Sequence, residues 1–436
     1  MRLGNTVLTQ LVVALGSADA ADADLFGPKA ANQAALGLAG LPIPDGFCLS
    51  ADAYRLQLKA AGVDKAINKL PAADLREARL LANEIRIGLF DSPIAPEILQ
   101  PLLAARQDLE DRTDAPLVVR SSALVEDREG SSFAGQFESF LGLDGEDEFL
   151  TAVRACWAAL WSVRALRYMG GHGIDPSGTA MALLIQPLIE AVSSGGGLSQ
   201  TADGGMILSA TWGLGEAIAQ GEVVPDRYEL NASGAIGHVD TGRKTHKVGC
   251  HLHQPEHHSA KVAKELVAER CLNDAQVIEL AGYLKKAEAM IGMAAEIEWA
   301  RDAAGFKMLQ VRPLQMEKSE VPDEIWLRRP GLKGHPAGIG WGSGKACVIN
   351  CECELARVAP GDILVTHVAG PTLSQILPMV SGVVAELGGS TSHLASLARE
   401  RGIPMVLGVL DATQKIPDGC QVAVDGVAGI VRWIEG

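Results

Sequence analysis

The chain has 436 residues, of which 47% are hydrophobic and 21% are charged, and its formal net charge is -15. This length suffices for about two or three domains with sizeable cores, and the composition is typical of a globular protein. The negative balance argues against nucleic acid or an anionic membrane as a main partner, because both attract basic surfaces. An anionic ligand therefore requires a locally positive site.

The N-terminus begins MRLGNTVLTQLVVALGSADA, with one arginine, an apolar run and then small residues, as in a secretory signal peptide. Thr9 and Gln10 interrupt the apolar run, and residues 7–15 fit a first buried strand equally well. No window reaches the ~18 uninterrupted apolar residues of a membrane span. The eight cysteines are scattered rather than framed as in a disulfide scaffold, so we expect a protein of the reducing cytoplasm.

Helical and strand patterns alternate over residues 20–315, with amphipathic helices predicted at 75–90 and 277–292. A charged stretch with two prolines, MEKSEVPDEIWLRRP, follows and is the predicted linker. After it, short V/I/L strands bounded by Gly and Pro, with one clear helix, predict a small α/β domain of roughly 100 residues. The predicted boundaries are a first domain at 1–316, a linker at 317–330 and a second domain at 331–436.

Two early segments place positive side chains where a polyphosphate can bind. In LFGPKAANQAAL, Lys29 follows a Gly-Pro turn and opens a helical stretch, so its charge adds to the helix dipole. In VVRSSALVEDREGSSFAGQFESF, Arg120 ends a Val-Val strand, and the loop after it offers backbone and hydroxyl donors. Both segments are therefore candidate phosphate-binding sites.

The segment EIEWARDAAGFKMLQVRPL predicts a β-hairpin over residues 296–312. Period-two alternation puts Glu296 and Glu298 on one face of the first strand, and Gln310 and Arg312 on one face of the second. Cross-strand pairing then gathers carboxylate, amide and guanidinium groups. Such oxygen ligands suit Mg²⁺ and the guanidinium suits phosphate, although a surface ribbon with a salt bridge shows the same pattern.

Two clusters of metal-binding residue types have ordinary explanations as well. The segment TGRKTHKVGCHLHQPEHHSA holds half of the ten histidines, and His251 and His253 share one strand parity, but the spacing fits a solvated loop better than a zinc site. Cys347, Cys351 and Cys353 share one parity on a predicted strand, which indicates core packing more than a soft-metal or redox cluster.

The segment GGSTSHLASLARERGIPMVLG predicts a helix from about 392 to 401, with capping hydroxyls before it and Arg399 in its last turn. His393 then lies at the helix N-terminus, where free N–H groups and the helix dipole favour an anion. The same field disfavours an imidazolium and keeps the ring a neutral nucleophile, and Thr391 and Ser392 offer hydroxyls to phosphate oxygens. The alternative is a capping or core histidine beside a Gly-Gly turn.

This segment resembles the phosphohistidine motif of the PEP-utilising enzyme family, which includes phosphoenolpyruvate synthase, pyruvate phosphate dikinase and rifampin phosphotransferase. The likeness extends from LKGHPAGIGWGSGKACV to VDGVAGIVRW. In that family this domain is a swivelling carrier whose histidine is phosphorylated at one site and discharged at another. The Lys29, Arg120 and hairpin segments, together with ILSATWGLGEAIAQGEVVPDRYEL, are similar to the family's N-terminal ATP-binding domain, although Pro28 departs from the usual Gly-Gly-Lys.

The resemblance implies a fold and a set of site residues. The expected fold class is α/β, with an ATP-grasp type nucleotide-binding domain followed by a small swivelling phosphohistidine domain. His393 would carry the phosphate with Thr391 and Ser392 beside it, and Glu298 and Gln310 would hold Mg²⁺. The expected ATP-binding residues are Lys29, Arg120, Ser131, Ser132, Gln186, Glu216, Glu298, Gln310 and Arg312.

The expected function is dikinase-type transfer of phosphate from Mg-ATP to His393 and then to an acceptor, with AMP and phosphate released. Other members carry a large barrel domain after the histidine domain, or an acceptor domain between the two modules. We find neither in this sequence, and so expect the acceptor to be a small molecule or to be bound by a separate subunit. The alternative is a regulatory protein that binds ATP without turnover, which would have no need of the carrier histidine.

Overall fold

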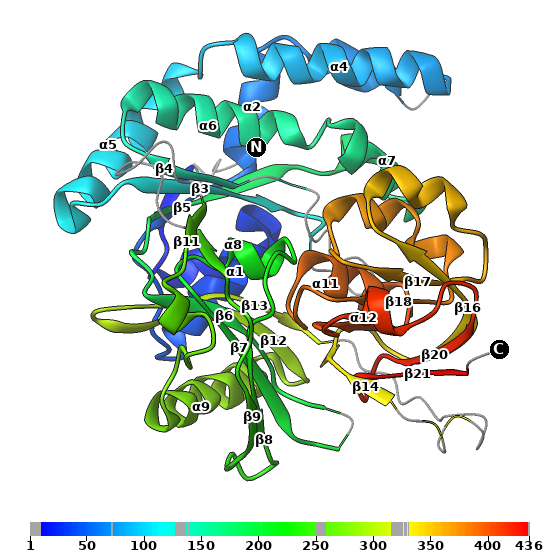
Figure 1. Cartoon of the computed structure of the whole chain (residues 1–436). Coiled ribbons are helices and arrows are strands. Elements are labelled where there is room, and N and C mark those ends of the chain that lie inside the picture. Colours follow the sequence, from blue (N-terminus) through cyan, green and yellow to red (C-terminus); the bar gives the residue numbers. More distant parts are fainter. Residues whose placement is uncertain are drawn as a thin grey trace. The chain divides into compact units, whose positions relative to one another are not determined.

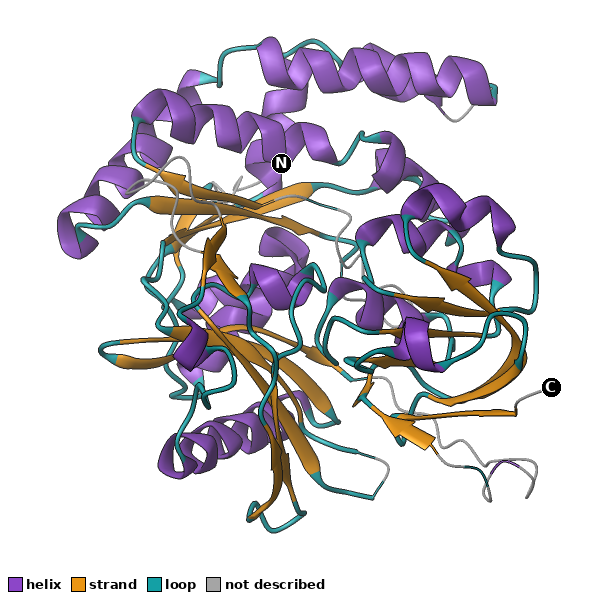
Figure 2. Ribbon diagram, in the orientation of Figure 1, coloured by secondary structure: helices purple, strands orange, loops and turns teal. Residues whose placement is uncertain are grey.

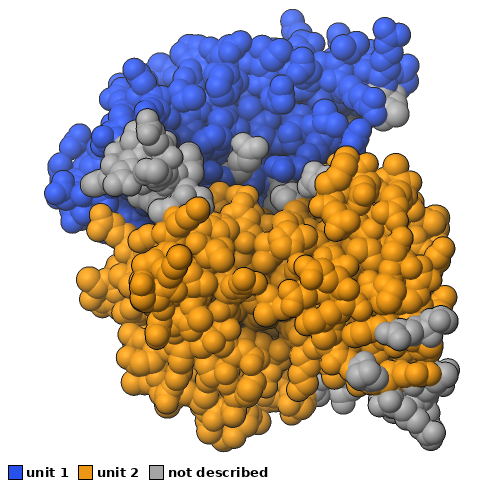
Figure 3. All heavy atoms as spheres, in the orientation of Figure 1, with its two compact units in different colours: residues 1–189 blue, residues 190–436 orange. Residues whose placement is uncertain are grey.

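The computed structural model describes residues 10–70, 73–126, 137, 139–201, 203–248, 259–314, 326, 329 and 331–434. The chain divides into two compact units, Met1–Ile189 and Glu190–Gly436 (Figure 3). This division falls inside the first of the two predicted domains. Most of the predicted linker at 317–330 lies outside the described residues, so its position stays a prediction.

The first unit contains a five-stranded antiparallel sheet with helices packed on it (Figure 1). Its strand order is β1 (Val12–Ala14), β2 (Phe47–Leu49), β5 (Met181–Pro187), β3 (Leu117–Ala123) and β4 (Ser139–Leu143). The helices are η1 (Ala18–Ala21), α1 (Ala23–Leu38), α2 (Ala51–Ala60), α3 (Asp64–Lys69), α4 (Leu75–Asp91), α5 (Pro96–Thr113), α6 (Glu146–Ala159), α7 (Val163–Gly171) and η3 (Pro176–Gly178).

Several predicted elements of this unit are confirmed. The predicted helix at 75–90 is α4, whose N-cap Asp74 accepts hydrogen bonds from the N–H groups of Arg76 and Glu77. The apolar run near the N-terminus contributes strand β1, where Val13 is buried with Phe26 of α1 in one hydrophobic cluster. Hydrophobic burial of this kind joins the first strand and helix to the sheet.

The stretch Glu146–Gly171 is long and apolar enough to pass a test for a membrane span by length and composition. In the structure it is two helices, α6 and α7, and half of its apolar window is buried inside the protein. Phe149, Val153 and Trp157 of α6 are fully buried. Core helices pass the same test, and the 14 residues of α6 give only about 21 Å of helix.

The second unit begins with a module of residues 190–314, built on a six-stranded antiparallel sheet. Its order is β13 (Gly305–Pro313), β12 (Ala295–Asp302), β6 (Ser193–Leu198), β7 (Met206–Trp212), β8 (Asp226–Leu230) and β9 (Ile236–Asp240). It also contains α8 (Glu216–Ala219), η5 (Lys264–Leu266), α9 (Asp274–Ile291) and the strand pair β10 (His246–Val248) and β11 (Ser259–Lys261).

Helix α9 covers one face of the six-stranded sheet (Figure 1). It begins with a capping box between Asn273 and Gln276 and ends at Gly292 in the left-handed conformation. A Cβ on Gly197 of β6 would lie 3.2 Å from both Leu284 of α9 and Ile297 of β12, so these residues belong to the covered face. Because side chains alternate along a strand, the neighbours of Ile297 in β12 point to the opposite face.

The remaining described part, the module of residues 331–434, is a mixed sheet with helices beside it (Figure 2). The strand order is β14 (Gly331–Lys333), β21 (Ile430–Ile434), β20 (Gln421–Asp425), β16 (Trp341–Ile349), β17 (Ile363–Thr366), β18 (Gly382–Ala385), β19 (Met405–Leu407) and β15 (His335–Pro336). The helices are η6 (Glu352–Arg357), η7 (Pro371–Gln375), η8 (Leu377–Met379), α11 (His393–Glu400) and α12 (Ala412–Lys415). This matches the small α/β domain expected here.

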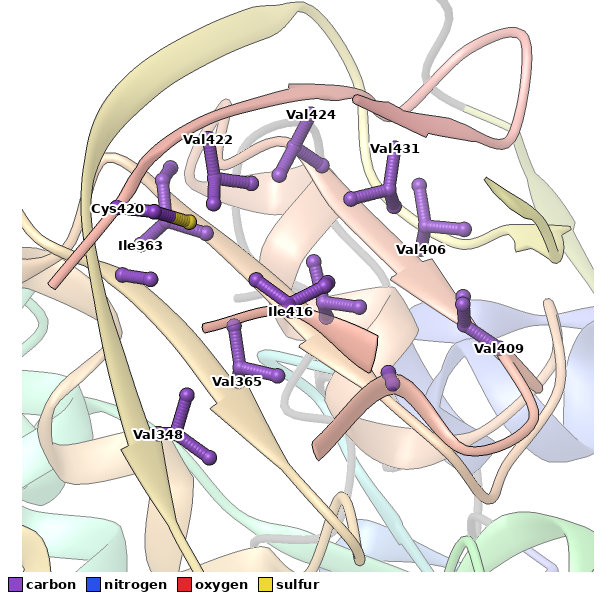
Figure 4. Close-up of a cluster of buried hydrophobic side chains, with 13 residues drawn as sticks. Val348, Ile363, Val365, Val406, Val409, Ile416, Cys420, Val422, Val424 and Val431 are labelled. Carbon is purple, nitrogen blue, oxygen red and sulfur yellow. The ribbon is translucent and has the colours of Figure 1, made fainter. Parts of the chain in front are cut away.

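The core of the 331–434 module is apolar and closely packed (Figure 4). Side chains of β16, β17, β18, β19, β20 and β21 meet Ala412 of α12 and Ile416, the residue that caps this helix, in one cluster. Val365, Val384 and Val422 in this cluster have no exposed surface. The parallel pairing of β16, β17 and β18 buries these strands and explains their continuous Val/Ile/Leu composition.

The structure corrects the interpretation of the cysteines in ACVINCECEL. Strand β16 ends at Ile349, so Cys351 and Cys353 do not continue it; they are exposed and joined to each other by a disulfide bond. Cys347 alone follows the expected pattern, because it is buried on β16. Strand parity does not apply to Cys351 and Cys353, because both lie beyond the end of β16.

Candidate active site

The hairpin predicted from the sequence is present. Strands β12 and β13 pair so that Glu296 lies opposite Arg312 and Glu298 lies opposite Gln310. Directly paired residues share a face, so all four side chains lie on the face opposite α9. Glu298 is also paired with Gly196 of β6, which extends this face to the next strand.

Arg312 is held by two acceptors in the second unit. Its Nη2 donates to Oε1 of Glu296 at 2.9 Å and its Nε donates to Oε2 of the same carboxylate at 3.2 Å. Nη2 also donates to Oγ of Ser396, a residue of α11, at 2.6 Å. The hairpin of the 190–314 module is thus bonded to the helix that follows His393.

A second arginine reaches the same carboxylate from α11. Nη2 of Arg399 donates to Oε2 of Glu296 at 2.7 Å, and its Nη1 donates to the carbonyl of Ser390 at 2.7 Å. Burial by itself raises the pKa of Glu296, but Arg312 and Arg399 outweigh this effect and hold the pKa below its ordinary value. Arg399 therefore does more than complement the helix dipole, which is the role its position in the last turn suggested.

The segment around His393 consists of a capped helix start and a loop that packs closely against the 190–314 module. The predicted helix is confirmed as α11, and its N-cap Ser392 accepts a hydrogen bond from the N–H of Ala395 at 3.2 Å. His393, half-buried, is its first residue. A Cβ on Gly389 would lie 2.7 Å from Cγ of Pro225 in the 190–314 module, so this glycine permits the close approach.

Thr391 lies on the hairpin face itself. A Cβ on Gly196 would lie 2.3 Å from Cγ2 and 2.6 Å from Cβ of Thr391, so the threonine occupies the space that a side chain at 196 would take. Because Gly196 is the direct partner of Glu298, the histidine loop sits beside the predicted Mg²⁺ ligands. On the same face, the hydroxyls of Ser209 and Thr211 are buried without a partner among the described residues.

Glu216 is the first residue of α8 and accepts a hydrogen bond from Nε2 of Gln220 at 2.7 Å. The turn before it includes Gly213, whose φ of 73° is left-handed and whose Cβ would lie 2.5 Å from the carbonyl of Val248. Gly213, the first glycine of GLGE, thus serves a tight turn before α8, whereas Gly215 has an ordinary helical conformation.

The first unit holds the predicted lysine in a buried polar cluster. Nζ of Lys29 donates to the carbonyl of Ser121 at 2.8 Å and pairs with Oε2 of Glu126 at 3.0 Å. Oγ of Ser122 accepts a hydrogen bond from the N–H of Ala30 at 3.1 Å, in the first turn after the Gly-Pro sequence. The beginning of this helical segment is therefore fastened to the end of β3.

Arg120 and Gln186 share one face of the sheet in the first unit. Arg120 is opposite Leu184, and Val118 is opposite Gln186, so both polar residues have the same parity. Strand β3 continues to Ala123, which corrects the expectation that Arg120 ends it. Nε2 of Gln186 is buried without a partner among the described residues.

Several predicted residues lie outside the described part of the chain. Ser131 and Ser132 belong to the stretch 127–136, and His251, His253 and Cys250 belong to 249–258. The nucleotide role of the first segment and the metal alternative for the second thus stay predictions. In the described ranges, no group of three or more His, Cys, Asp or Glu side chains is arranged to hold a metal ion.

The residues present fit Mg²⁺ as it binds in nucleotide enzymes. Glu298 and Gln310 are adjacent across the hairpin and supply a carboxylate and an amide oxygen. Mg²⁺ commonly takes one or two protein carboxylates and completes its shell with substrate phosphates and water. The fit therefore requires a nucleotide on the same face.

Comparison with known proteins places this chain in a family. Residues 23–328 match the pyruvate phosphate dikinase, AMP/ATP-binding domain, and residues 358–429 match the PEP-utilising enzyme, mobile domain. The chain belongs to the pyruvate phosphate dikinase AMP/ATP-binding family. The predicted fold class is thereby confirmed, with an ATP-grasp type domain followed by the mobile α/β domain.

Curated relatives agree with this assignment. The chain is 31% identical to phosphoenolpyruvate synthase of Pyrococcus furiosus, over 94% of this chain and 57% of that protein. It is 32% identical to phosphoenolpyruvate synthase of Escherichia coli, over 91% of this chain and 53% of that protein. The phosphoenolpyruvate synthase of Aeropyrum pernix is 31% identical over 93% of this chain and 56% of its own length. The chain thus spans about half the length of these relatives.

Sequence reasoning missed several residues that the structure brings to the sites of this family member. Glu126 neutralises Lys29, and Ser396 and Arg399 join α11 to the hairpin. In the sequence, Glu126 could have been recognised as an acidic residue a few positions after Arg120. For Arg399 the signal was its position on the buried side of an amphipathic helix, two turns after His393.

Proposed function

We propose that this chain transfers a phosphoryl group from Mg-ATP to His393, with AMP and inorganic phosphate as products, and then passes it to an acceptor. The observation that carries the proposal is the position of the histidine loop against the hairpin face. Thr391, two residues before His393, packs against Gly196, and Gly196 is paired with Glu298 on the hairpin face. This arrangement brings the candidate nucleophile to the module that bears the candidate metal ligands.

The chemistry balances with one molecule of water. A ring nitrogen of His393 donates its lone pair to the β-phosphorus of ATP, an N–P bond forms, and the P–O bond to the α-phosphate breaks, so that AMP leaves. Water then cleaves the γ-phosphate from the pyrophosphoryl histidine as inorganic phosphate, and the released protons go to solvent. Positioning and charge neutralisation are what such a transfer mainly needs from the protein.

The remaining residues keep the roles that the family resemblance implies. Glu298 and Gln310 would hold Mg²⁺, which when bound neutralises phosphate charge. Arg312 would face the transferring phosphate, with Glu296 limiting its freedom. Lys29, Arg120, Ser131, Ser132, Gln186 and Glu216 complete the proposed nucleotide-binding set.

The test uses ATP labelled separately in the β and γ positions. After incubation of the whole chain with each substrate, we expect acid-labile label on His393 from β-labelled ATP, and label released as phosphate from γ-labelled ATP. His393→Ala should abolish the bound label, while His238→Ala, at an exposed histidine of β9, should retain it. Label that persists in His393→Ala would contradict the relay.

The same experiment separates the regulatory alternative. A protein that binds ATP without turnover would show saturable nucleotide binding and no covalent label on any residue. We favour turnover because the histidine loop and the hairpin carboxylates are brought together, which nucleotide binding alone does not require. A cytoplasmic setting belongs to the same proposal, because ATP is abundant there. Co-purification after labelling would test for an acceptor-binding subunit.

A further inference from the structure

Glu296 is shared by arginines from two modules of the second unit. Arg312 of β13 and Arg399 of α11 both donate to its carboxylate, at 2.9 and 2.7 Å. Oγ of Ser396 accepts from both guanidinium groups, at 2.6 Å from Arg312 and 3.3 Å from Arg399. All four side chains are buried. The network therefore forms only when α11 is against the hairpin.

Steric fit supports the same docked arrangement. The three atoms nearest to a Cβ built on Gly196 all belong to the side chain of Thr391, between 2.3 and 2.7 Å away. Backbone contacts add to it, because the N–H of Gly388 donates to the carbonyl of Val223 at 2.9 Å. Arg227 also donates to the carbonyl of Gly334 at 2.8 Å. The contact is thus specific in shape as well as in charge.

We infer that Glu296, Ser396 and Arg399 form a docking latch, which seats the His393 loop on the hairpin face and orients Arg312 for the transfer from ATP. The inference rests on the proposed function and names positioning residues for its first step. Arg399 and Ser396 act through Arg312 and Glu296 rather than on the reacting atoms. Undocking removes Ser396 and Arg399 from the hairpin, so the complete set of contacts around Arg312 and Glu296 forms only while the histidine is in place.

The physical basis is the geometry of the guanidinium fork. Arg312 meets Glu296 through two parallel N–H groups, a planar arrangement that fixes the direction of its remaining donors. Arg399 divides its two Nη groups between Glu296 and the carbonyl of Ser390, in the turn just before Thr391. The one side chain thereby ties the histidine loop to the carboxylate that holds Arg312.

The first test compares Arg399→Met with Arg401→Met. Met keeps much of the side-chain length but removes the charge, and Arg401 is an exposed residue at the end of the same helix. In single-turnover labelling with Mg-ATP, we expect Arg399→Met to slow phosphohistidine formation on the order of 100-fold, as misplacement of a reacting group does. Arg401→Met should match the wild type. Arg399→Lys, whose single amine cannot bridge Glu296 and the carbonyl of Ser390 as the guanidinium does, should be intermediate.

A small phosphoryl donor distinguishes positioning from local damage. Phosphoramidate can phosphorylate an accessible histidine without any docking, so Arg399→Met should take up phosphate from it at the wild-type rate. Affinity for the Mg²⁺ complex of a non-hydrolysable ATP analogue, measured by calorimetry, should also be unchanged. A parallel loss of phosphoramidate labelling would show that Arg399 acts only within its own module, and would overturn the inference.

A second pair of variants leaves Arg399 untouched. Gly196→Ala places a methyl group where Thr391 sits, whereas Gly282→Ala adds one at a position of α9 with open space around it. We expect slow transfer from ATP in the first variant and wild-type transfer in the second. Thr391→Gly removes the obstructing side chain, so Gly196→Ala should cost far less in the Thr391→Gly background.

The outcomes separate this inference from the proposed function. If wild-type protein takes up no label from ATP, the proposed function fails. If the wild type is labelled, and Arg399→Met and Gly196→Ala are both labelled at the wild-type rate, the function stands and the latch is wrong. Slow labelling from ATP with normal labelling from phosphoramidate, in both variants, supports the latch.

Discussion

The core of the 331–434 module is apolar, whereas its contact with the 190–314 module is mainly polar. The core is a cluster of buried Val, Ile and Ala side chains with one Cys. The contact consists of a shared carboxylate, two guanidinium groups, backbone hydrogen bonds and close glycine approaches. The apolar part holds the module together, while the polar part can separate and be solvated again.

The free energies of these two kinds of interaction agree with their different roles. Burial of one Val or Leu side chain is worth about 1.5–3 kcal/mol, and this term is lost only when the module unfolds. A buried ion pair roughly balances its attraction against the cost of desolvation, so opening it in favour of water changes the free energy little. A carrier that must dock and release therefore benefits from a polar contact around a permanent apolar core.

The largest expected effect is on the hairpin side of the contact. Glu298→Gln removes a carboxylate from the candidate Mg²⁺ site without changing its size, and we expect a roughly 1000-fold slower transfer from ATP to His393. The midpoint of urea unfolding should stay unchanged. Glu279→Gln, at an exposed position of α9, is the matched control and should leave both quantities as in the wild type. Equal rates for the two variants would remove Glu298 from the site.

The core should respond in the opposite way. Val384→Ala opens a cavity among the fully buried side chains and should lower the free energy of unfolding by about 2–3 kcal/mol. Transfer from ATP should persist under conditions where the variant stays folded. Val368→Ala, at an exposed position in the same module, should change neither quantity. Loss of transfer in a core variant that is still fully folded would contradict the proposed difference between core and contact.

A buried histidine makes the stability of the fold sensitive to acid. His335 is 4% exposed, and burial, together with the positive charge of Arg227 from the facing module, lowers its pKa to about 3. Above pH ~6.5 the ring is neutral in folded and unfolded chains; below it, the unfolded state binds the proton and stability falls by about 1.4 kcal/mol per pH unit. His335→Gln should flatten this part of the stability curve.

Measurement of unfolding free energy between pH 7 and pH 5 checks this expectation, with about a 2 kcal/mol difference in pH response between wild type and His335→Gln. His238→Gln, at an exposed histidine, should keep the wild-type slope. Equal slopes for wild type and His335→Gln would show that His335 takes up its proton without unfolding.

The smallest effect separates capping from catalysis at Ser392. Its hydroxyl accepts from the N–H of Ala395, so Ser392→Ala should cost about 1 kcal/mol of stability, while Ser392→Asn should keep the cap. If Ser392 serves only as a cap, transfer from ATP will be preserved in Ser392→Asn. Loss of transfer in a stable Ser392→Asn variant would instead support the predicted contact with phosphate.

Local patterns predicted the parts of the site that depend on neighbouring residues. Period-two alternation predicted that Glu296 and Glu298 share a face of one strand, and that Gln310 and Arg312 share a face of its partner. The bounds of α11 followed from its capping serine and from the glycine and proline after it. These features are set within one turn or one strand pair, so a single sequence contains them.

Contacts between distant segments were not predictable in this way. Arg399 and Glu296 are 103 residues apart, and no local pattern in either segment indicates that they pair. The salt bridge between Lys29 and Glu126 and the fit of Thr391 against Gly196 have the same character. The disulfide between Cys351 and Cys353 was missed for a local reason, because strand β16 ends earlier than its parity suggested.

The central claim is that ATP phosphorylates His393, and phosphorus NMR of the whole chain mixed with Mg-ATP tests it most directly. The account predicts a phosphohistidine resonance that grows together with AMP and inorganic phosphate, and that is absent in His393→Ala. ADP as the only nucleotide product, with no resonance from a nitrogen-bound phosphate, would contradict it.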